Sequence, residues 1–440
     1  MSRVPILVIL GATGSGKSRL GIELARRFRG EIISADSMQV YRGLDVVTAK
    51  VSKEEQAQAR HHMIDIIDPI QELTVVDFRN RALRIIDGLL KENKLPLVVG
   101  GTNYYIEALL WQILVDDPRQ QGGEFDSEEE WTSKKPRREE GLSSEDLHKK
   151  LMQVDPEMAE RLHPNDRRKV IRSLEIFERH GQTHSEILKQ QRLAGGCGLG
   201  GPLRHKNSII FWLTCNQAVL NERLDARVDS MLKAGLVQEL LDFHERYNKD
   251  RLEQNQLPDY TRGIFQSIGF KEFHNYLILP KEKRETEEAR NMLSEAIENL
   301  KMATRRYAKR QRKWVNNRLL RRADRQVPPV YSLDCSNVEQ WESEVYGKAV
   351  EIVSAVMRGE TPSQQPMNSV IDNAKDTDSS NFKRHFCEVC ERILINDLQW
   401  HAHMTGAKHR KMVLKRKKAL QSQTQELPVS ESNVCQEEKN

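Results

Sequence analysis

A glycine-rich loop close to the start of the sequence constrains the fold of this chain more than any other feature. Residues 11–18 read Gly-Ala-Thr-Gly-Ser-Gly-Lys-Ser, which is the spacing of a phosphate-binding loop. The apolar run Val4 to Leu10 before the loop predicts a buried parallel strand, and Arg19 to Phe28 after it predicts a helix. This strand–loop–helix order, followed by further strand and helix patterns, predicts an α/β fold with a parallel sheet.

The ligand expected at this loop is a diphosphate. Backbone N–H groups and the positive end of the helix dipole bind phosphate oxygens in such a loop. Lys17 is expected to reach the outer phosphate, and Ser18 is expected to ligate Mg²⁺. The loop does not distinguish ATP from another diphosphate, and a glycine-rich turn without a ligand is the plainer alternative. The predicted diphosphate-binding residues of the loop are Gly11, Thr13, Gly14, Ser15, Gly16, Lys17 and Ser18.

Polar residues follow two further predicted strands. Glu31 to Ala35 precedes Asp36, and Leu95 to Val99 precedes the segment Gly100 to Tyr105. Polar groups at the carboxyl ends of parallel strands converge on the crevice where open α/β sheets bind ligands. Asp36 is a candidate general base in that crevice, and a Mg²⁺ ligand of a small-molecule kinase is the alternative. A kinase would also need a lid rich in phosphate-binding arginines, which residues 116–140 supply poorly.

Six motifs, taken in order, resemble those of the tRNA dimethylallyltransferases, also called tRNA isopentenyltransferases. They lie between about Val4 and Arg322, at residues 11–18, 36–41, 100–105, 163–166, 268–272 and 304–311. The resemblance implies a P-loop NTPase-like parallel sheet with a helical insertion domain. It also implies transfer of a dimethylallyl group from dimethylallyl diphosphate to N6 of the adenosine immediately 3′ of the anticodon. The loop would then hold that diphosphate instead of driving a nucleotide cycle.

The chemistry of this reaction assigns roles within the predicted crevice. Adenine N6 is a poor nucleophile, so a base must take its proton, and Asp36 is expected to do so. Lys17 and the loop amides, with Mg²⁺, are expected to stabilise charge on the leaving diphosphate. The resemblance assigns Thr102 to orienting the prenyl group and diphosphate, and a helix N-cap is the alternative. Arg223 is expected to close over the diphosphate, with Arg227 one helical turn further on, although arginines at this spacing are common on exposed helices.

Contacts with the tRNA anticodon stem-loop are expected from several segments. By resemblance, Asp36, Ser37, Met38 and Gln39 contact the target adenosine, which must leave the base stack to reach them. Residues 301–325 contain eleven Lys and Arg against one acid, and residues 408–418 contain seven with no acid. Such basic segments are typical of phosphate-backbone binding, and a solvated helix face is the alternative. The other predicted tRNA contacts are Arg167, Arg168, Lys169, Arg172, Arg305 and Arg306.

Changes in composition and periodicity divide the chain into six parts. They are a first core segment, a helical tRNA-binding insertion, a second core segment, a linker, a zinc finger, and a tail that is basic and then polar and disordered. Their expected bounds are residues 1–115, 116–205, 206–357, 358–381, 382–412 and 413–440. The second core segment is expected to contain a strand at 208–215 and helices within 217–247, 292–319 and 338–357.

A cysteine–histidine pattern near the end of the sequence predicts a Cys₂His₂ zinc finger. Two cysteines two residues apart are followed after twelve residues by one histidine and after five more by another. The four predicted Zn²⁺ ligands are Cys387, Cys390, His403 and His409. His401 is a rival ligand, and Phe382 or Phe386 with Leu398 is expected to form the small core. The finger resembles that of the eukaryotic members of the family, and its expected use is extra contact with the tRNA backbone.

Composition limits the remaining function classes. Lys and Arg number 69 against 64 Asp and Glu, so the net charge of +5 argues only weakly for a polyanionic partner. The six cysteines are sparse, which fits a reducing compartment. No apolar run reaches the roughly 18 residues of a membrane-spanning helix, and no signal peptide precedes the first strand. The expectations are a monomer, no membrane partner, and a cytoplasmic location, with the nucleus as an option and a mitochondrial pool if a longer isoform exists. A zinc-finger regulator that binds nucleic acid is the second alternative function.

Overall fold

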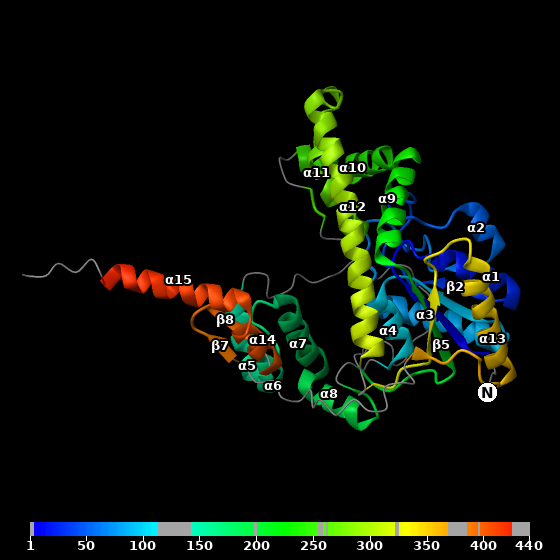
Figure 1. Ribbon diagram of the computed structural model, residues 1–440, viewed down its shortest axis with the longest axis horizontal. Coiled ribbons are helices and arrows are strands. Elements are labelled where there is room, and N and C mark those ends of the chain that lie inside the picture. The colour runs from blue at the N-terminus through cyan, green and yellow to red at the C-terminus, as the bar shows by residue number, and fades with distance from the viewer. Residues whose placement is uncertain are drawn as a thin grey trace, which may run out of the picture. The chain divides into compact units, whose positions relative to one another are not determined.

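The chain forms two compact units. The first contains the segments Met1–Asp117 and Gln191–Lys375, and the second contains Pro118–Gln190 and Asp376–Asn440. The architecture is that of a computed structural model (Figure 1). It describes residues 4–112, 142–197, 200–253, 258–260, 263–321, 325–367, 385–394 and 397–424.

A six-stranded parallel sheet forms the centre of the first unit (Figure 1). Its strand order is β3-β2-β4-β1-β5-β6, so the strand before the glycine-rich loop lies inside the sheet. Four of the strands coincide with the apolar runs in the sequence. The other two were not predicted, because β3 is a pair of histidines and β6 is a short alternating segment, and neither contains an apolar run. The strands are β1 (Ile6–Gly11), β2 (Glu31–Ser34), β3 (His61–His62), β4 (Pro96–Val99), β5 (Ser208–Thr214) and β6 (Val330–Asp334).

Helices cover both faces of this sheet. Val8 of β1 packs in one hydrophobic cluster with α3 and α4, while Leu7 and Ile9 pack in a second cluster with α1 and α13. Neighbouring strand residues point to opposite faces, so both faces of β1 are buried and the strand is apolar throughout. The predicted α/β class is therefore confirmed. The covering helices are α1 (Lys17–Phe28), α3 (Val75–Lys91), α4 (Asn103–Leu110) and α13 (Lys348–Arg358).

A third hydrophobic cluster joins four more helices to the loop that follows β2. These helices are α9 (Gln217–Lys233), α10 (Leu236–Glu253), α11 (Phe270–Leu277) and α12 (Glu287–Val315). Gly235, with φ 93°, separates α9 from α10 within the segment predicted as helical. The long basic helix is confirmed as α12. The shorter elements of this unit are α2 (Lys53–Gln58), η2 (Gly263–Gln266), η3 (Lys281–Lys283), η4 (Asn316–Leu320) and η5 (Glu342–Gly347).

The insertion is helical, as the sequence predicts. Its helices are α5 (Ser144–Val154), α6 (Pro156–Arg161), α7 (Arg167–His180) and α8 (His184–Leu193). They bury a shared apolar face that includes Leu147, Leu151, Met158, Val170 and Leu174. Phe177 was expected on this face, but it lies near the end of α7 and is 37% exposed.

Hydrogen bonds place two boundaries differently from the predicted ones. Gly201 N donates to Gln112 O at 2.6 Å, so the segment after residue 200 belongs to the first unit and the insertion ends before residue 205. Gln364 Nε2 donates to Ser332 O at 2.9 Å, so the beginning of the predicted linker still packs on the core. The predicted surface excursion at 116–140 and the linker residues 368–381 lie outside the described residues.

The C-terminal module contains a two-stranded antiparallel sheet and two helices. Its elements are β7 (His385–Cys387), β8 (Arg392–Leu394), α14 (Asp397–Met404) and α15 (Ala407–Thr424). The basic segment with which the predicted tail begins at residue 413 is helical, because α15 extends through it to Thr424. Residues 425–440 and Phe382 lie outside the described residues, as does the side chain of Leu398. Among the helices that the structure describes, none is both long and apolar enough to cross a bilayer.

Candidate active site and metal centre

The glycine-rich loop joins β1 to α1 in a conformation that requires glycine. Gly14 and Gly16 have φ values of 78° and 89°, which residues with a side chain rarely adopt. A Cβ on Gly14 would lie 2.9 Å from Leu224, and one on Gly16 would lie 2.8 Å from Trp341. The loop is therefore tightly held, and it leads into the N-terminus of α1, where the helix dipole favours an anion.

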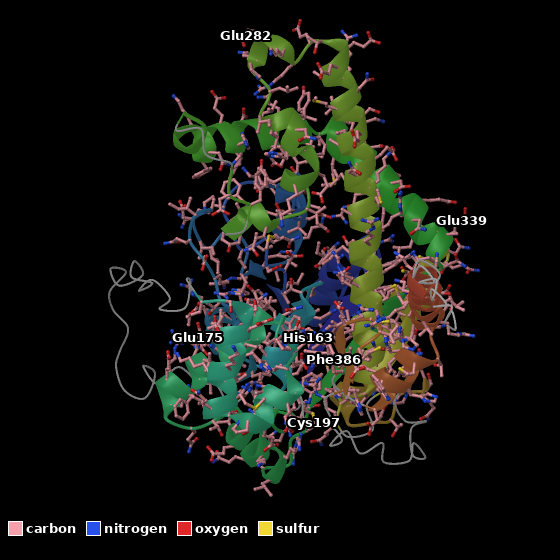
Figure 2. All side chains as sticks on the ribbon, turned by 90° about the vertical axis from the view of Figure 1, so that its left-hand side faces the viewer. His163, Glu175, Cys197, Glu282, Glu339 and Phe386 are labelled. Atoms are coloured by element: carbon pink, nitrogen blue, oxygen red, sulfur yellow. The ribbon has the colours of Figure 1, made fainter. Side chains whose placement is uncertain are left out.

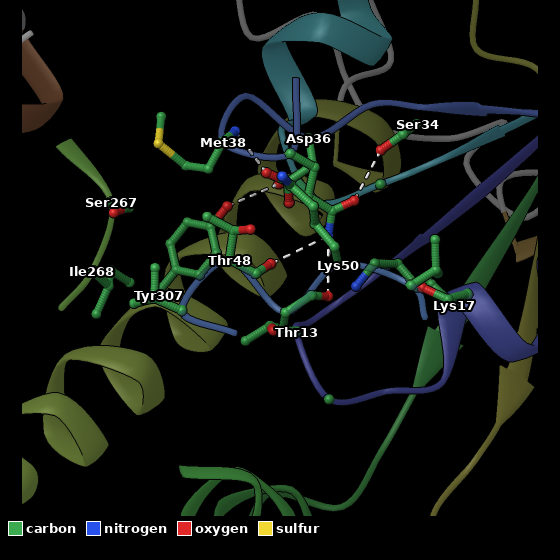
Figure 3. A pocket seen from close by; sticks show the side chains of 18 of the residues that line it. Thr13, Lys17, Ser34, Asp36, Met38, Thr48, Lys50, Ser267, Ile268 and Tyr307 are labelled. Atoms are coloured by element: carbon green, nitrogen blue, oxygen red, sulfur yellow. Dashed lines mark hydrogen bonds between the residues drawn. The ribbon is translucent and has the colours of Figure 1, made fainter. Parts of the chain in front are cut away.

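The loop opens onto a cavity of about 650 Å³ in the first unit (Figure 3). Much of the remaining lining comes from the carboxyl ends of β2 and β4, the loop that follows β2, residues 266–268, α9 and α12. The predicted site residues that line the cavity are Thr13, Gly14, Gly16, Lys17, Ser18, Asp36, Ser37, Met38 and Gln39. The predicted residues of this unit that do not line it are Gly11, Ser15, Thr102, Arg223, Arg305 and Arg306. The phosphate-binding loop and the candidate base thus share one cavity.

Asp36 lies directly after β2 and faces this cavity (Figure 3). Its Oδ1 accepts a hydrogen bond from Met38 N at 2.9 Å. Burial raises the pKa of Asp36 above its ordinary value, while the hydrogen bond and the charges of Lys17 and Arg227 act in the opposite direction. A carboxylate with a raised pKa is a stronger base, so its environment suits proton abstraction.

Thr102 holds the segment that carries Asp36. Its Oγ1 accepts a hydrogen bond from Ser37 N at 2.9 Å and donates to Ser37 Oγ at 3.3 Å. The phenol of Tyr307 on α12 donates to the neighbouring Gly101 O at 3.5 Å. Although Thr102 precedes α4, its hydroxyl accepts no hydrogen bond from that helix, which removes the N-cap alternative. Thr102 therefore positions the Asp36 segment from behind the cavity wall.

Lys17 is the first residue of α1, and its side chain folds back over the loop. Its Nζ donates to Ala12 O at 2.8 Å. Burial and, to a smaller extent, the charge of Arg227 lower the pKa of Lys17 to about 8, although the charge of Asp36 acts in the opposite direction. Two desolvated cations side by side repel each other, so an anionic ligand between them would stabilise both charges.

Of the two arginines considered on α9, Arg227 lines the cavity, as do Arg19 and Arg310, whereas Arg223 does not. The guanidinium of Arg223 donates to Cys335 O at 2.7 Å and to Ser336 O at 2.8 Å, beyond the end of β6. These bonds hold it among backbone carbonyls outside the cavity lining, so its closing over a diphosphate stays a prediction. Arg227 lies one turn further along α9 and lines the cavity. Within the described part of the chain, Arg227 has no hydrogen bond or ion pair.

Sequence reasoning missed Gln311 of α12, which joins the two loops at the cavity. Its Oε1 accepts a hydrogen bond from Thr13 N at 2.8 Å, and its Nε2 donates to Gly101 O at 3.1 Å. A Cβ on Gly101 would overlap the Gln311 amide, which explains the glycine at that position. Gln311 is the last residue of the sixth motif, in which only the arginines were predicted to be functional. An uncharged amide is a weak signal inside a strongly basic helix.

Gln39 fixes the shape of the loop after β2. Its Oε1 accepts a hydrogen bond from Ser34 Oγ at 3.1 Å, and its Nε2 donates to Thr48 O and Ala49 O, each at 3.3 Å. The polar atoms of Gln39 are thus already hydrogen-bonded within the loop. Residues 37–38 line the cavity next to it, so contact of this segment with a nucleoside stays a prediction.

The predicted tRNA-binding cations of the insertion lie on α7. Lys169 pairs with Asp166 at 2.8 Å, and Arg172 pairs with Glu175, labelled in Figure 2, at 3.6 Å. Surface ion pairs of this kind contribute little, so a phosphate could readily compete for these cations. On α12, Arg305 pairs with Asp225 of α9, whereas Arg306 is exposed. The four insertion residues that remain candidates are Arg167, Arg168, Lys169 and Arg172.

Four ligand atoms converge in the C-terminal module, and all lie within 4.8 Å of one another. They belong to Cys387, Cys390, His403 and His409. The two sulfurs lie 3.6 and 3.4 Å from His409 Nδ1. His403 Nε2 is buried and has no hydrogen-bond partner among the described residues, as expected of a metal-ligating atom. Two thiols and two imidazoles are the donor set of a structural Zn²⁺ site, so the predicted ligands fit this ion.

Two expectations about the finger are now decided. His401 lies outside the four-ligand cluster, so the rival ligand is excluded. Phe386, labelled in Figure 2, is 56% exposed, so the expectation that it contributes to a small core is wrong. Alternation along β7 explains this, because Cys387 is buried and its neighbour must then face the other side.

The fold and the cavity define a P-loop α/β protein with an acidic residue beside its anion site. Residues 39–318 match the IPP transferase family, and residues 384–410 match a family described as zinc-finger double-stranded RNA-binding. The chain belongs to the IPP transferase family, and the resemblance carried by the six motifs is thereby confirmed.

Individual relatives are similar in sequence to this chain over nearly its full length. The chain is 50% identical over 420 residues to a tRNA dimethylallyltransferase of Homo sapiens, covering 94% of this chain and 87% of the relative. Identity to a tRNA dimethylallyltransferase of Schizosaccharomyces pombe is 33% over 442 residues, covering 95% and 97%. A solved structure of a eukaryotic dimethylallyltransferase acting on tRNA matches with a TM-score of 0.76 and 27% identity, covering 96% of this chain and all of that one.

Proposed function

We propose that this chain transfers a dimethylallyl group from dimethylallyl diphosphate to N6 of the adenosine immediately 3′ of the anticodon in tRNA. The observation that carries the proposal is one cavity lined by both the phosphate-binding loop and Asp36. The loop suits a diphosphate, and Asp36 suits removal of a proton from an incoming nucleophile. The names of the human and fission yeast relatives support the choice of prenyl donor and acceptor.

The diphosphate would bind against the loop between Thr13 and Ser18. Lys17 and Arg227 would neutralise its charge, and both attract an anion more strongly here than at the surface because they are desolvated. Ser18, the predicted Mg²⁺ ligand, lines the same cavity with a hydroxyl oxygen, which fits the hard cation Mg²⁺. When bound, Mg²⁺ would supply further positive charge against the departing diphosphate.

The transfer would use Asp36 as the general base. The N6 nitrogen forms a bond to C1 of the dimethylallyl group while the bond from C1 to the diphosphate oxygen breaks. The Asp36 carboxylate takes the N6 proton, and the electron pair of the broken bond leaves with the diphosphate. The Lys17 ammonium stabilises that leaving charge. Thr102 keeps Asp36 in place through its hydrogen bond to Ser37 N.

The tRNA would bind through cations outside the cavity. The α7 residues Arg167 to Arg172 in the insertion and exposed cations of α12 supply positive charge suited to a phosphate backbone. The finger and the basic helix α15 would add further backbone contacts. This division leaves the cavity free to receive the everted adenosine.

An ATP-free assay tests the proposal. Unmodified tRNA, labelled dimethylallyl diphosphate and Mg²⁺ should give labelled N6-isopentenyladenosine on nucleoside analysis, with no ATP present. Lys17→Ala should lower the rate by about 10²-fold or more, because the leaving charge loses its cation. Lys53→Ala, on α2 and outside the cavity lining, is the matched control and should behave as the wild type. Strict dependence of the transfer on ATP would favour a small-molecule kinase instead.

A further inference from the structure

A partly exposed aromatic cluster lies where α4 meets α12, outside the cavity lining. It consists of Tyr104, Trp314 and Arg318, and we name it the Tyr104 cluster. The ring centroids of Tyr104 and Trp314 are 6.2 Å apart in an edge-to-face arrangement. The guanidinium carbon of Arg318 lies 6.0 Å from the Tyr104 centroid and 5.9 Å from the Trp314 centroid. These distances are in the range of aromatic and cation–π contacts.

The Tyr104 cluster is anchored at its base and open at its tip. Trp314 packs against the hydrophobic cluster that contains α3 and α4. Arg318 donates to Glu107 Oε1 at 3.3 Å. Tyr104, in contrast, is 60% exposed, and its hydroxyl has no hydrogen-bond partner among the described residues. A flat apolar group that covers such an exposed ring removes apolar surface from water, which is favourable, and the ring is already held in place.

Chain connectivity places the Tyr104 cluster beside the cavity. Tyr104 follows Thr102 by two residues, and Thr102 holds the segment that carries Asp36. Trp314 follows the cavity-lining residue Gln311 by three residues on α12, a rise of about 4.5 Å. A nucleotide chain with one base in the cavity could therefore place a neighbouring base over Tyr104.

The surface around the Tyr104 cluster is cationic. From Lys301 to Arg321 the chain contains no acidic residue. Arg310 and Lys313 are exposed, and neither has an ion pair within the part of the chain that is described. The guanidinium of Arg310 also lies 5.8 Å from the ring of Tyr307, at the cavity. Aromatic rings beside a positively charged track are the features with which proteins bind single-stranded nucleic acid.

We infer that the Tyr104 cluster is a stacking platform for one unpaired base of the anticodon loop, next to the adenosine that enters the cavity. The inference rests on the proposed function, because it takes RNA as the substrate. A base stacked on Tyr104 would replace part of the stacking that is lost when the target adenosine is everted. Tyr104 is thus a positioning residue that acts on RNA binding and not on the transfer step.

Binding of a fluorescently labelled anticodon stem-loop RNA tests the inference without relying on catalysis. Tyr104→Ala should raise the Kd by about 5- to 100-fold, the range for removal of one base–aromatic stack. Tyr104→Phe keeps the ring and should bind as the wild type does. Ile70→Ala is the matched control, because Ile70 is 67% exposed and lies outside the cavity lining. In activity assays, Tyr104→Ala should raise the KM for RNA and leave kcat unchanged.

A panel of stem-loops, each with one abasic loop nucleotide, identifies the stacked base. One abasic position should weaken wild-type binding as much as Tyr104→Ala does, and should add nothing further in that variant. An unchanged Kd for Tyr104→Ala, or equal losses of affinity for the Ala and Phe variants, would overturn the inference. A wild-type chain that binds the RNA but does not prenylate it would count against the proposed function instead.

Discussion

The cavity of the first unit and the metal cluster of the C-terminal module both follow from short motifs, but they are built differently. At the cavity, Gln311 bonds to Thr13 across 298 residues of sequence, and segments from distant parts of the chain surround Asp36. In the finger, Cys387 and His409 are only 22 residues apart and delimit the whole ligand set. One site is a product of the tertiary fold, and the other is almost local.

The two sites are therefore stabilised in different ways. Packing of a large core shapes the cavity, so the pKa values of Lys17 and Asp36 are already shifted without a ligand. A module as small as the finger buries little apolar surface, and Phe386 is exposed, so metal–ligand bonds must supply much of its stability. We therefore expect the cavity to carry the chemistry and the finger to affect only the binding of tRNA.

The largest effect is expected at Asp36. Asp36→Asn keeps the shape of the side chain but cannot take the N6 proton, so single-turnover rates should fall by about 10²- to 10⁴-fold. The Kd for tRNA should change little. Asp87→Asn is the matched control, because Asp87 is an exposed carboxylate on α3 outside the cavity lining.

The pH profile sharpens the assignment of Asp36. Burial raises the pKa of this carboxyl, so the wild-type rate should fall as the pH drops through that raised value and the base becomes protonated. The Asn variant should lack this acid limb. A variant rate within a few-fold of the wild type would show that Asp36 is not the base, and would reopen the metal-ligand alternative.

A smaller effect is expected on the alkaline side of the profile, from Lys17. Its pKa is about 8 in the free protein, and the ammonium form binds the diphosphate. The value of kcat/KM for dimethylallyl diphosphate should therefore fall above about pH 8, because it reports the free enzyme. Bound diphosphate raises the pKa of Lys17, so the limb in kcat should move to higher pH. Coinciding limbs in the two profiles would contradict this role.

The smallest effect is expected from the finger. His403→Ala removes one Zn²⁺ ligand and should weaken tRNA binding. The slope of log affinity against log salt should become shallower by about 0.7 to 0.9 for each tRNA phosphate that α15 no longer neutralises. His401→Ala is the matched control, because His401 lies outside the four-ligand cluster. An unchanged slope in His403→Ala would mean that the module does not bind the tRNA backbone.

Sequence periodicity predicted the parts of the fold that a regular pattern encodes. Buried strands such as Val4 to Leu10 are apolar on both faces, and α12 has a basic helical pattern. The β3 strand was missed because two residues carry no period, and its pairing with β2 depends on tertiary context. The break at Gly235 was missed because helical spacing continues on both sides of it.

The residues of the candidate site also fall into two groups, those that a sequence motif predicts and those whose role depends on tertiary contacts. Residues inside the loop motif, such as Lys17, were found because backbone geometry forces their spacing. The sequence does not distinguish Arg223 from Arg227. The difference arises in the tertiary structure, where Arg223 donates hydrogen bonds to Cys335 O and Ser336 O. Gln311 was missed for a related reason, since its partners lie in two other loops.

We expect the cavity to carry the chemistry and the finger to affect only tRNA binding. The most direct test of this division of roles is the single-turnover rate of a chain that ends at Met367. This variant lacks the finger and α15 but keeps the hydrogen bond from Gln364 to Ser332 and every residue assigned to the chemistry. At saturating tRNA and dimethylallyl diphosphate, its rate should equal that of the full chain, although its Kd for tRNA is weaker. Complete loss of the single-turnover reaction in a folded, RNA-binding truncation would contradict the account, because the finger would then be needed to place the adenosine.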